Sequence, residues 1–76
     1  SSFAANFNLG NSLYRQEKFE DAAEQFAKAS ALAGDDKGRI AAAYHNQGNA
    51  LLSANKIDEL PTKTFGSVPQ LVVELP

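Results

Sequence analysis

Asparagines carry most of the binding chemistry that this chain could offer. They recur in two frames of the form Asn-x-Gly-Asn, at residues 8–11 and 46–49. A carboxamide both donates and accepts hydrogen bonds, so a row of carboxamides can hold a peptide backbone without reading its side chains. The alternative is that these asparagines only form hydrogen bonds between neighbouring helices, and the sequence leaves both interpretations open.

Catalysis and metal binding find little support among the other reactive side chains. His45 is the only histidine and the chain has no cysteine, so a metal site or a histidine-based catalytic set lacks its usual second member. Asp35 and Asp36 do not have the spacing of a calcium loop, and helix capping is the better interpretation for them. We therefore expect no catalytic residue, no metal site and no cofactor.

Charge and hydropathy exclude two further classes of function. The seven Lys and Arg residues are scattered in a chain of net charge −2, which predicts no nucleic-acid binding because that needs a continuous positive surface. The longest apolar run falls far short of the roughly 20 residues of a membrane span. The chain starts at Ser1 and has no signal peptide, so we expect a soluble fragment or processed chain, and the sequence does not decide between cytoplasm and periplasm.

The two asparagine frames belong to a longer internal repeat. Residues 4–13 and 42–51 are identical at six of ten aligned positions, with an offset of 38 residues. A repeat of this period indicates stacked supersecondary units, which usually form a binding surface and not an active site.

Hydrophobic periodicity predicts that three helices position these residues, at about 3–16, 19–33 and 37–54. Ser1 or Ser2 can cap the first helix, and Asp35 or Asp36 the third. The apolar positions expected on the first helix are Phe3, Phe7, Leu9, Leu13 and Tyr14. Gly10 falls in the middle of that helix, where it costs roughly 0.5–1 kcal/mol relative to Ala, so we expect a second helix to pack closely there.

The remainder of the chain has a different composition. Residues 57–60 would begin a fourth helix, but Pro61 removes a backbone donor and ends it almost at once. Proline, glycine and β-branched residues then favour an extended backbone. The predicted organisation is an all-α domain at 1–60, followed by an apolar, non-helical tail at 61–76.

Seven residues of the first two predicted helices keep the spacing of a known repeat: Leu9, Gly10, Leu13, Phe19, Ala22, Phe26 and Ala29. By these residues the helical part resembles the tetratricopeptide repeat, a 34-residue helix–turn–helix unit. The resemblance covers residues 3–60, or about one and a half repeats, and a weaker resemblance connects the phrase at 44–52 to bacterial aerotolerance-operon repeat proteins. The chain departs from the family pattern at Asn6, where an aromatic residue is usual, and at Gly34, where proline is usual.

The resemblance implies that the first helix of each repeat lines a groove that holds a peptide or protein segment. Carried over position by position, the groove residues are Phe7, Asn11, Tyr14, Arg15, His45, Asn46, Asn49 and Leu52. Phe7 and Tyr14 could equally be core residues. The family's clamp for chaperone carboxyl termini is not expected, because Phe7 stands where that clamp has its first lysine and the third repeat is missing.

The second copy is cut short, so the third helix would lack its partner. The tail could fold back on that face, a second chain could cover it, or the tail could belong to another segment. In the first two cases the contact residues would be Phe65, Val68, Leu71 and Val73. The sequence thus predicts a non-catalytic protein-interaction module, and the alternative function is self-assembly into a homo-oligomer. Of the three ways to cover the open face of the third helix, we prefer self-association.

Overall fold

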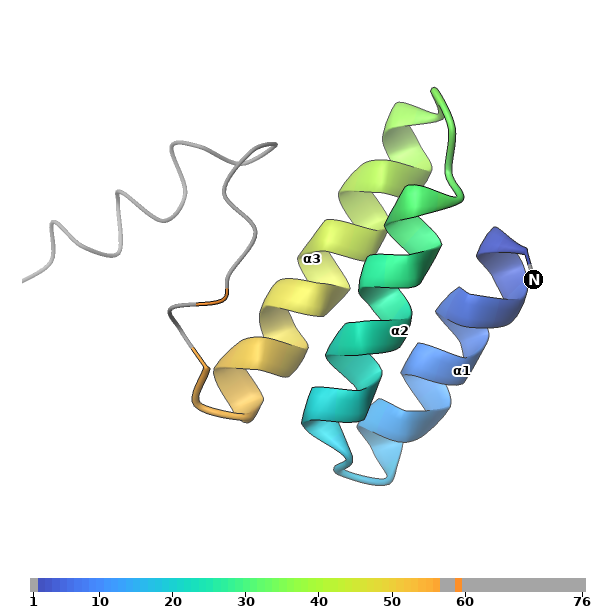
Figure 1. Ribbon diagram of the computed structural model, residues 1–76. Helices are drawn as coiled ribbons and strands as arrows, with labels where there is room; N and C mark the ends of the chain where they lie inside the picture. The colour runs from blue at the N-terminus through green and yellow to red at the C-terminus, as the bar shows by residue number, and fades with distance from the viewer. Residues whose placement is uncertain (1, 57–58, 60–76) are drawn as a thin grey trace, which may run out of the picture.

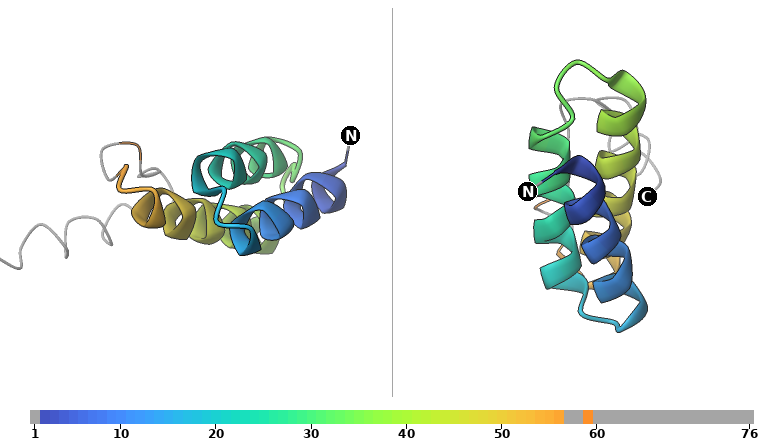
Figure 2. Two further views of the ribbon diagram at one scale, coloured as in Figure 1. Left: turned by 90° about the horizontal axis from the view of Figure 1, so that it is seen from below. Right: turned by 90° about the vertical axis from the view of Figure 1, so that its right-hand side faces the viewer.

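Three α-helices make up the described part of the computed structural model, which covers residues 2–56 and 59. Helix α1 spans Phe3–Arg15, α2 spans Phe19–Ala31 and α3 spans Lys37–Ser53. Consecutive helices run in opposite directions, so α1 and α3 are parallel (Figure 1). Viewed along another axis, α2 lies over the line where α1 and α3 meet (Figure 2). The described residues therefore contain the predicted all-α repeat and no strand; the predicted tail lies outside them.

Two of the three helices begin at a side-chain cap. The Ser2 hydroxyl accepts a hydrogen bond of 3.1 Å from the backbone N–H of Ala5 at the start of α1. At the start of α3 the Asp36 carboxylate accepts one of 3.1 Å from the N–H of Arg39. Each side chain satisfies one of the backbone donors that a helix leaves unpaired in its first turn. Of the two candidates predicted for each cap, these are the ones used.

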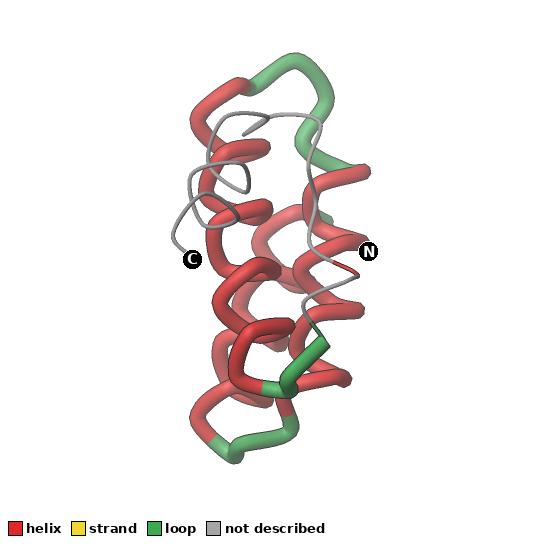
Figure 3. The backbone as a smooth tube through the Cα atoms, turned by 90° about the vertical axis from the view of Figure 1, so that its left-hand side faces the viewer, coloured by secondary structure: helices red, strands yellow, loops and turns green. Residues whose placement is uncertain are grey.

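The predicted helices were one or two residues too long at their carboxyl ends, which lie at residues 15, 31 and 53 and not at 16, 33 and 54. Loops follow all three helices (Figure 3). The reason for the earlier helix ends is left-handed backbone in these loops, where Glu17 has φ 63°, Gly34 has φ 63° and Asn55 has φ 64°. Left-handed residues end a helix because its hydrogen-bond ladder cannot continue through them. The residues between each helix end and the left-handed residue therefore belong to the turn and not to the helix.

Phe26 is the centre of the core. It is 1% exposed and packs with small or aliphatic residues from α2 and α3, of which Ala22 and Ala50 are fully buried. Full burial of a phenylalanine side chain stabilises a fold by about 1.5–3 kcal/mol. The remaining members of the cluster are Ala23, Leu51, Phe7, Leu13 and Tyr14.

Gly10 has the packing role that its cost in mid-helix predicts. It is buried, and a Cβ atom placed on it would lie 2.6 Å from Cε1 of Phe26. The missing side chain therefore lets α1 approach the ring edge. Leu9, one of the apolar positions expected on this helix, is 47% exposed. It lies on a side of α1 that none of the described helices covers.

Candidate functional site

A line of contacts joins the two parallel helices α1 and α3, which carry the two copies of the asparagine frame. Asn46 Nδ2 donates a hydrogen bond of 3.3 Å to Asn11 Oδ1. Closer to the carboxyl ends of the same pair of helices, the Tyr14 hydroxyl lies 3.0 Å from the hydroxyl of Ser53. The contacts connect residues 35 and 39 apart in sequence, so they fix the register of one repeat copy against the other.

Four of the predicted groove residues line one recess on this face. Its volume is about 130 Å³, and it is lined by Asn11, Tyr14, Asn46 and Asn49, with Phe26 as the remaining lining residue. The recess thus combines three carboxamides and a phenol with an aromatic ring from the core. A ligand group entering it would meet both donors and acceptors beside an apolar surface.

The Asn11–Asn46 pair uses only part of the hydrogen-bonding capacity of the two side chains. Each carboxamide offers two N–H donors and an oxygen with two lone pairs. Within the described residues, the pair's mutual bond is their one side-chain hydrogen bond, and the Asn49 carboxamide has none. Both interpretations of the asparagines therefore have a physical basis here: one pair connects the helices, and the unused groups face the recess.

The other predicted groove residues lie outside the recess. Phe7 is half-buried, stacks on Phe3 with ring centroids 5.2 Å apart, and meets the edge of Phe26 at 5.5 Å. This ring belongs to the hydrophobic cluster, which is the core alternative that the sequence left open. Arg15, His45 and Leu52 are exposed, Leu52 to 53%.

Tyr14 has a double role that the sequence did not decide. Its ring packs edge-on against Phe19 with centroids 5.1 Å apart, while its hydroxyl reaches the recess side and Ser53. It is thus part of the core by its ring and part of the recess by its polar end, an arrangement typical of partly buried tyrosines.

Asn6 is a residue whose place sequence reasoning missed. It is 6% exposed, and its Nδ2 donates a hydrogen bond of 2.8 Å to the carbonyl of Ser2. The sequence did contain a signal for this burial, because Asn6 stands where the family pattern usually has an aromatic residue. Its burial is possible because the carboxamide bonds to the first turn of its own helix.

Metal coordination has no support in the part of the chain that is described. No group of three or more His, Cys, Asp and Glu side chains there is arranged to hold an ion. Among the same residues, no helix has the length and apolar character needed to cross a bilayer.

The comparison with family models decides the type of repeat. Residues 3–36 match the model of the tetratricopeptide repeat, a span that contains α1, α2 and the turn between them. These residues form a tetratricopeptide repeat. Such repeats are non-catalytic modules that mediate protein–protein interaction, which implies a protein partner. Neither the curated proteins nor the solved structures contain a match to the chain.

Helix α3 lies beyond the matched residues, and its sequence repeats part of that of α1. It carries the second copy of the asparagine frame, and it packs beside α1 and against α2. The recess is thus formed where the first helices of two successive copies meet.

Proposed function

We propose that this chain is a protein-interaction module that holds an extended segment of a partner protein along the face shared by α1 and α3. The observation that carries the proposal is the recess lined by Asn11, Tyr14, Asn46 and Asn49. A peptide backbone presents alternating N–H and C=O groups, which are the complement of carboxamides that have unused donors and acceptors.

The chemistry of the recess favours a neutral backbone over a chain terminus. Of its lining residues only Tyr14 is titratable, and none carries a positive charge. A terminal carboxylate would lack the charge-assisted hydrogen bonds that make such groups bind strongly.

A displayed library of random peptides, selected against the full chain, tests this function. Peptides that are enriched should bind more weakly to Asn11→Ala and Asn49→Ala, by about five-fold for each lost hydrogen bond, since such a bond contributes about 1 kcal/mol. The matched control is Asn8→Ala, which removes an exposed carboxamide of α1 that does not line the recess.

Two results would contradict the proposal. One is equal weakening by the Asn8 control and the recess variants, because the recess would then have no special part in binding. The other is NMR shift changes, on adding an enriched peptide, that map to the outer side of α2 and not to α1 and α3. Self-assembly, the alternative function predicted from the sequence, depends on residues 65–73, which lie outside the described part of the chain.

A further inference from the structure

A second recess, of about 260 Å³, lies between α2 and α3 on the side away from α1. Its apolar lining comes from Ala23, Ala27 and Leu51. Three carboxylates surround that lining; they belong to Glu20, Glu24 and Glu59. Glu24 pairs with Lys28 at 3.7 Å and Glu20 with Lys56 at 3.2 Å, so the recess has an apolar floor and a rim of charged side chains. It shares no residue with the recess lined by Asn11, Asn46 and Asn49.

The internal repeat explains why α3 presents an apolar surface at this place. With the 38-residue offset, Leu51 of α3 corresponds to Leu13 of α1, which packs against the hydrophobic core that α1 shares with α2. Leu51 is 3% exposed and also lines the recess. The side of α1 that packs against α2, the helix that follows it, thus corresponds to the side of α3 that borders the recess.

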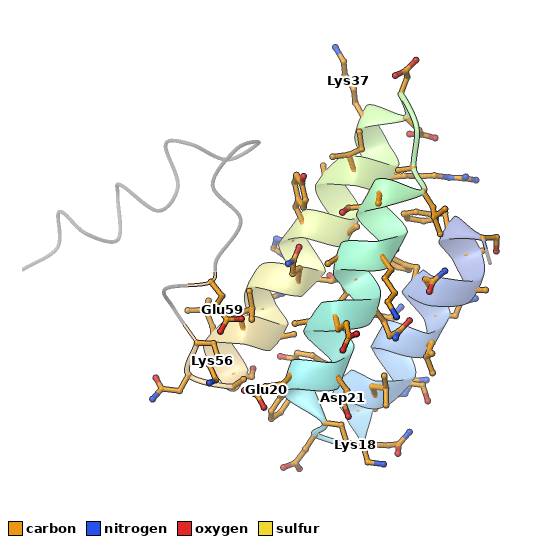
Figure 4. All side chains as sticks on the ribbon, in the orientation of Figure 1. Lys18, Glu20, Asp21, Lys37, Lys56 and Glu59 are labelled. Atoms are coloured by element: carbon orange, nitrogen blue, oxygen red, sulfur yellow. The ribbon has the colours of Figure 1, made fainter. Side chains whose placement is uncertain are left out.

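The chain itself leads to this recess after α3 ends. Glu59 lines the rim, and its backbone N–H donates a hydrogen bond of 3.1 Å to the carbonyl of Lys56. Lys56 Nζ in turn lies 3.2 Å from Glu20 Oε2 on α2 (Figure 4). The turn after α3 is therefore attached to α2 beside the recess, and Glu59, the last described residue, lies at the rim.

We propose that residues 60–76 of the same chain bind across this recess. They include the apolar residues Phe65, Val68, Leu71 and Val73, which suit its floor, and Lys63, whose ammonium group is complementary to the Glu59 carboxylate at the rim. An extended chain advances about 3.3 Å per residue, so about six residues span the roughly 20 Å length of a helix such as α2. The segment is long enough to cover the recess from the position of Glu59.

The proposal has a consequence for the interaction module. A segment of this chain would complete the second repeat copy in place of a helix, and it would do so on the side away from the asparagine recess. Partner binding along α1 and α3 and coverage of the α2–α3 recess would then occur on different surfaces of one monomer.

A nitroxide spin label tests the proposal, because the chain has no cysteine and one can be introduced at a chosen site. The label is placed at the exposed rim residue in Glu24→Cys, and at an exposed site on α1 in the control Asn8→Cys. We expect strong broadening of the amide signals of residues 65–73 from the Glu24 site and little from the Asn8 site. Equal broadening from both sites, or none from either, would overturn the proposal.

Mixing experiments distinguish coverage within one chain from coverage by a second copy. Isotope-labelled chain without nitroxide is mixed with unlabelled Glu24→Cys chain that carries it. Intramolecular binding predicts no broadening of residues 65–73 in the mixture. Broadening of residues 65–73 as strong as in a chain that carries both the isotope label and the nitroxide would show that a second copy covers the recess, and the proposal would be wrong.

Hydrogen exchange of the α3 amides gives an independent measurement. In Val68→Asp a carboxylate replaces an apolar contact, and in the control Ser67→Asp it replaces a neighbouring polar residue. We expect at least several-fold faster exchange around Leu51 in the first variant and unchanged exchange in the second. Equal exchange in both variants would mean that Val68 makes no contact with the floor, contrary to the proposal.

Discussion

Replacing Gly10 by alanine is the most direct test of how α1 and α2 are held together. The added methyl group would lie 2.6, 2.8 and 2.9 Å from three ring atoms of Phe26. These distances are well below ordinary carbon–carbon contact, so the ring or the helix must move. Phe26 is 1% exposed and belongs to one core cluster with Ala22, Ala23 and Ala50, so moving the ring disturbs that packing.

Two opposing effects decide the sign of the change. Alanine is the better helix residue by about 0.5–1 kcal/mol. Overfilling a packed core costs about 1–3 kcal/mol, and three simultaneous close contacts point to the upper part of that range. We expect the free energy of unfolding of Gly10→Ala to fall by about 1–2 kcal/mol, which in a domain of this size lowers the melting temperature by about 4–8 °C per kcal/mol.

Urea denaturation followed by circular dichroism measures this change. Gly38→Ala is the matched control, because a Cβ atom there would meet only the Asp36 carboxylate, at 3.4 Å, and the variant should be as stable as the parent or slightly more stable. A double-mutant cycle with Phe26→Leu isolates the ring contact. The reasoning is refuted if Gly10→Ala is no less stable than the parent, or if it is equally destabilising when the ring is absent.

Five further substitutions test three local features. Tyr14→Phe should lower the free energy of unfolding by about 0.5–1 kcal/mol, and adding Ser53→Ala should cost little more, because both variants remove one shared hydrogen bond. Glu17→Gly should stabilise the fold by up to about 1 kcal/mol and Asn55→Gly by less, since both residues have positive φ but asparagine tolerates it better. Asp36→Ala should cost about 1 kcal/mol through loss of the cap of α3. Urea titrations measure all of these changes. Three results would contradict the predictions: a larger gain from Asn55→Gly than from Glu17→Gly, equal stability of Asp36→Ala and the parent, and fully additive losses for Tyr14→Phe and Ser53→Ala.

Much of the helical fold could be predicted from the sequence because it depends on local signals. Apolar periodicity located three helices, and the preference of Ser and Asp for cap positions located the starts of the first and third, where Ser2 and Asp36 accept the capping hydrogen bonds. The cost of a glycine in mid-helix predicted close packing at Gly10, and the ring of Phe26 is found there.

The features that escaped prediction depend on the relative placement of helices. The hydrogen bond between Tyr14 and Ser53 requires a particular axial offset of α1 and α3, which repeat spacing does not specify to within a side chain's reach. Leu9 followed the apolar pattern but lies on an uncovered side of α1, because pattern alone does not say which neighbours are present. Asn6 is buried through a bond to its own helix start, a local solution for which composition gives no rule.

The central position of α2 has a consequence for how the molecule folds. Helix α2 packs against both its predecessor and its successor in the chain, so the contacts that build the core join segments close in sequence. Such a topology has low contact order and favours rapid folding. We expect α2 to belong to both helical hairpins as they form, and its central amides, around Phe26, to be the last of the described part to exchange with solvent when the chain opens from its ends.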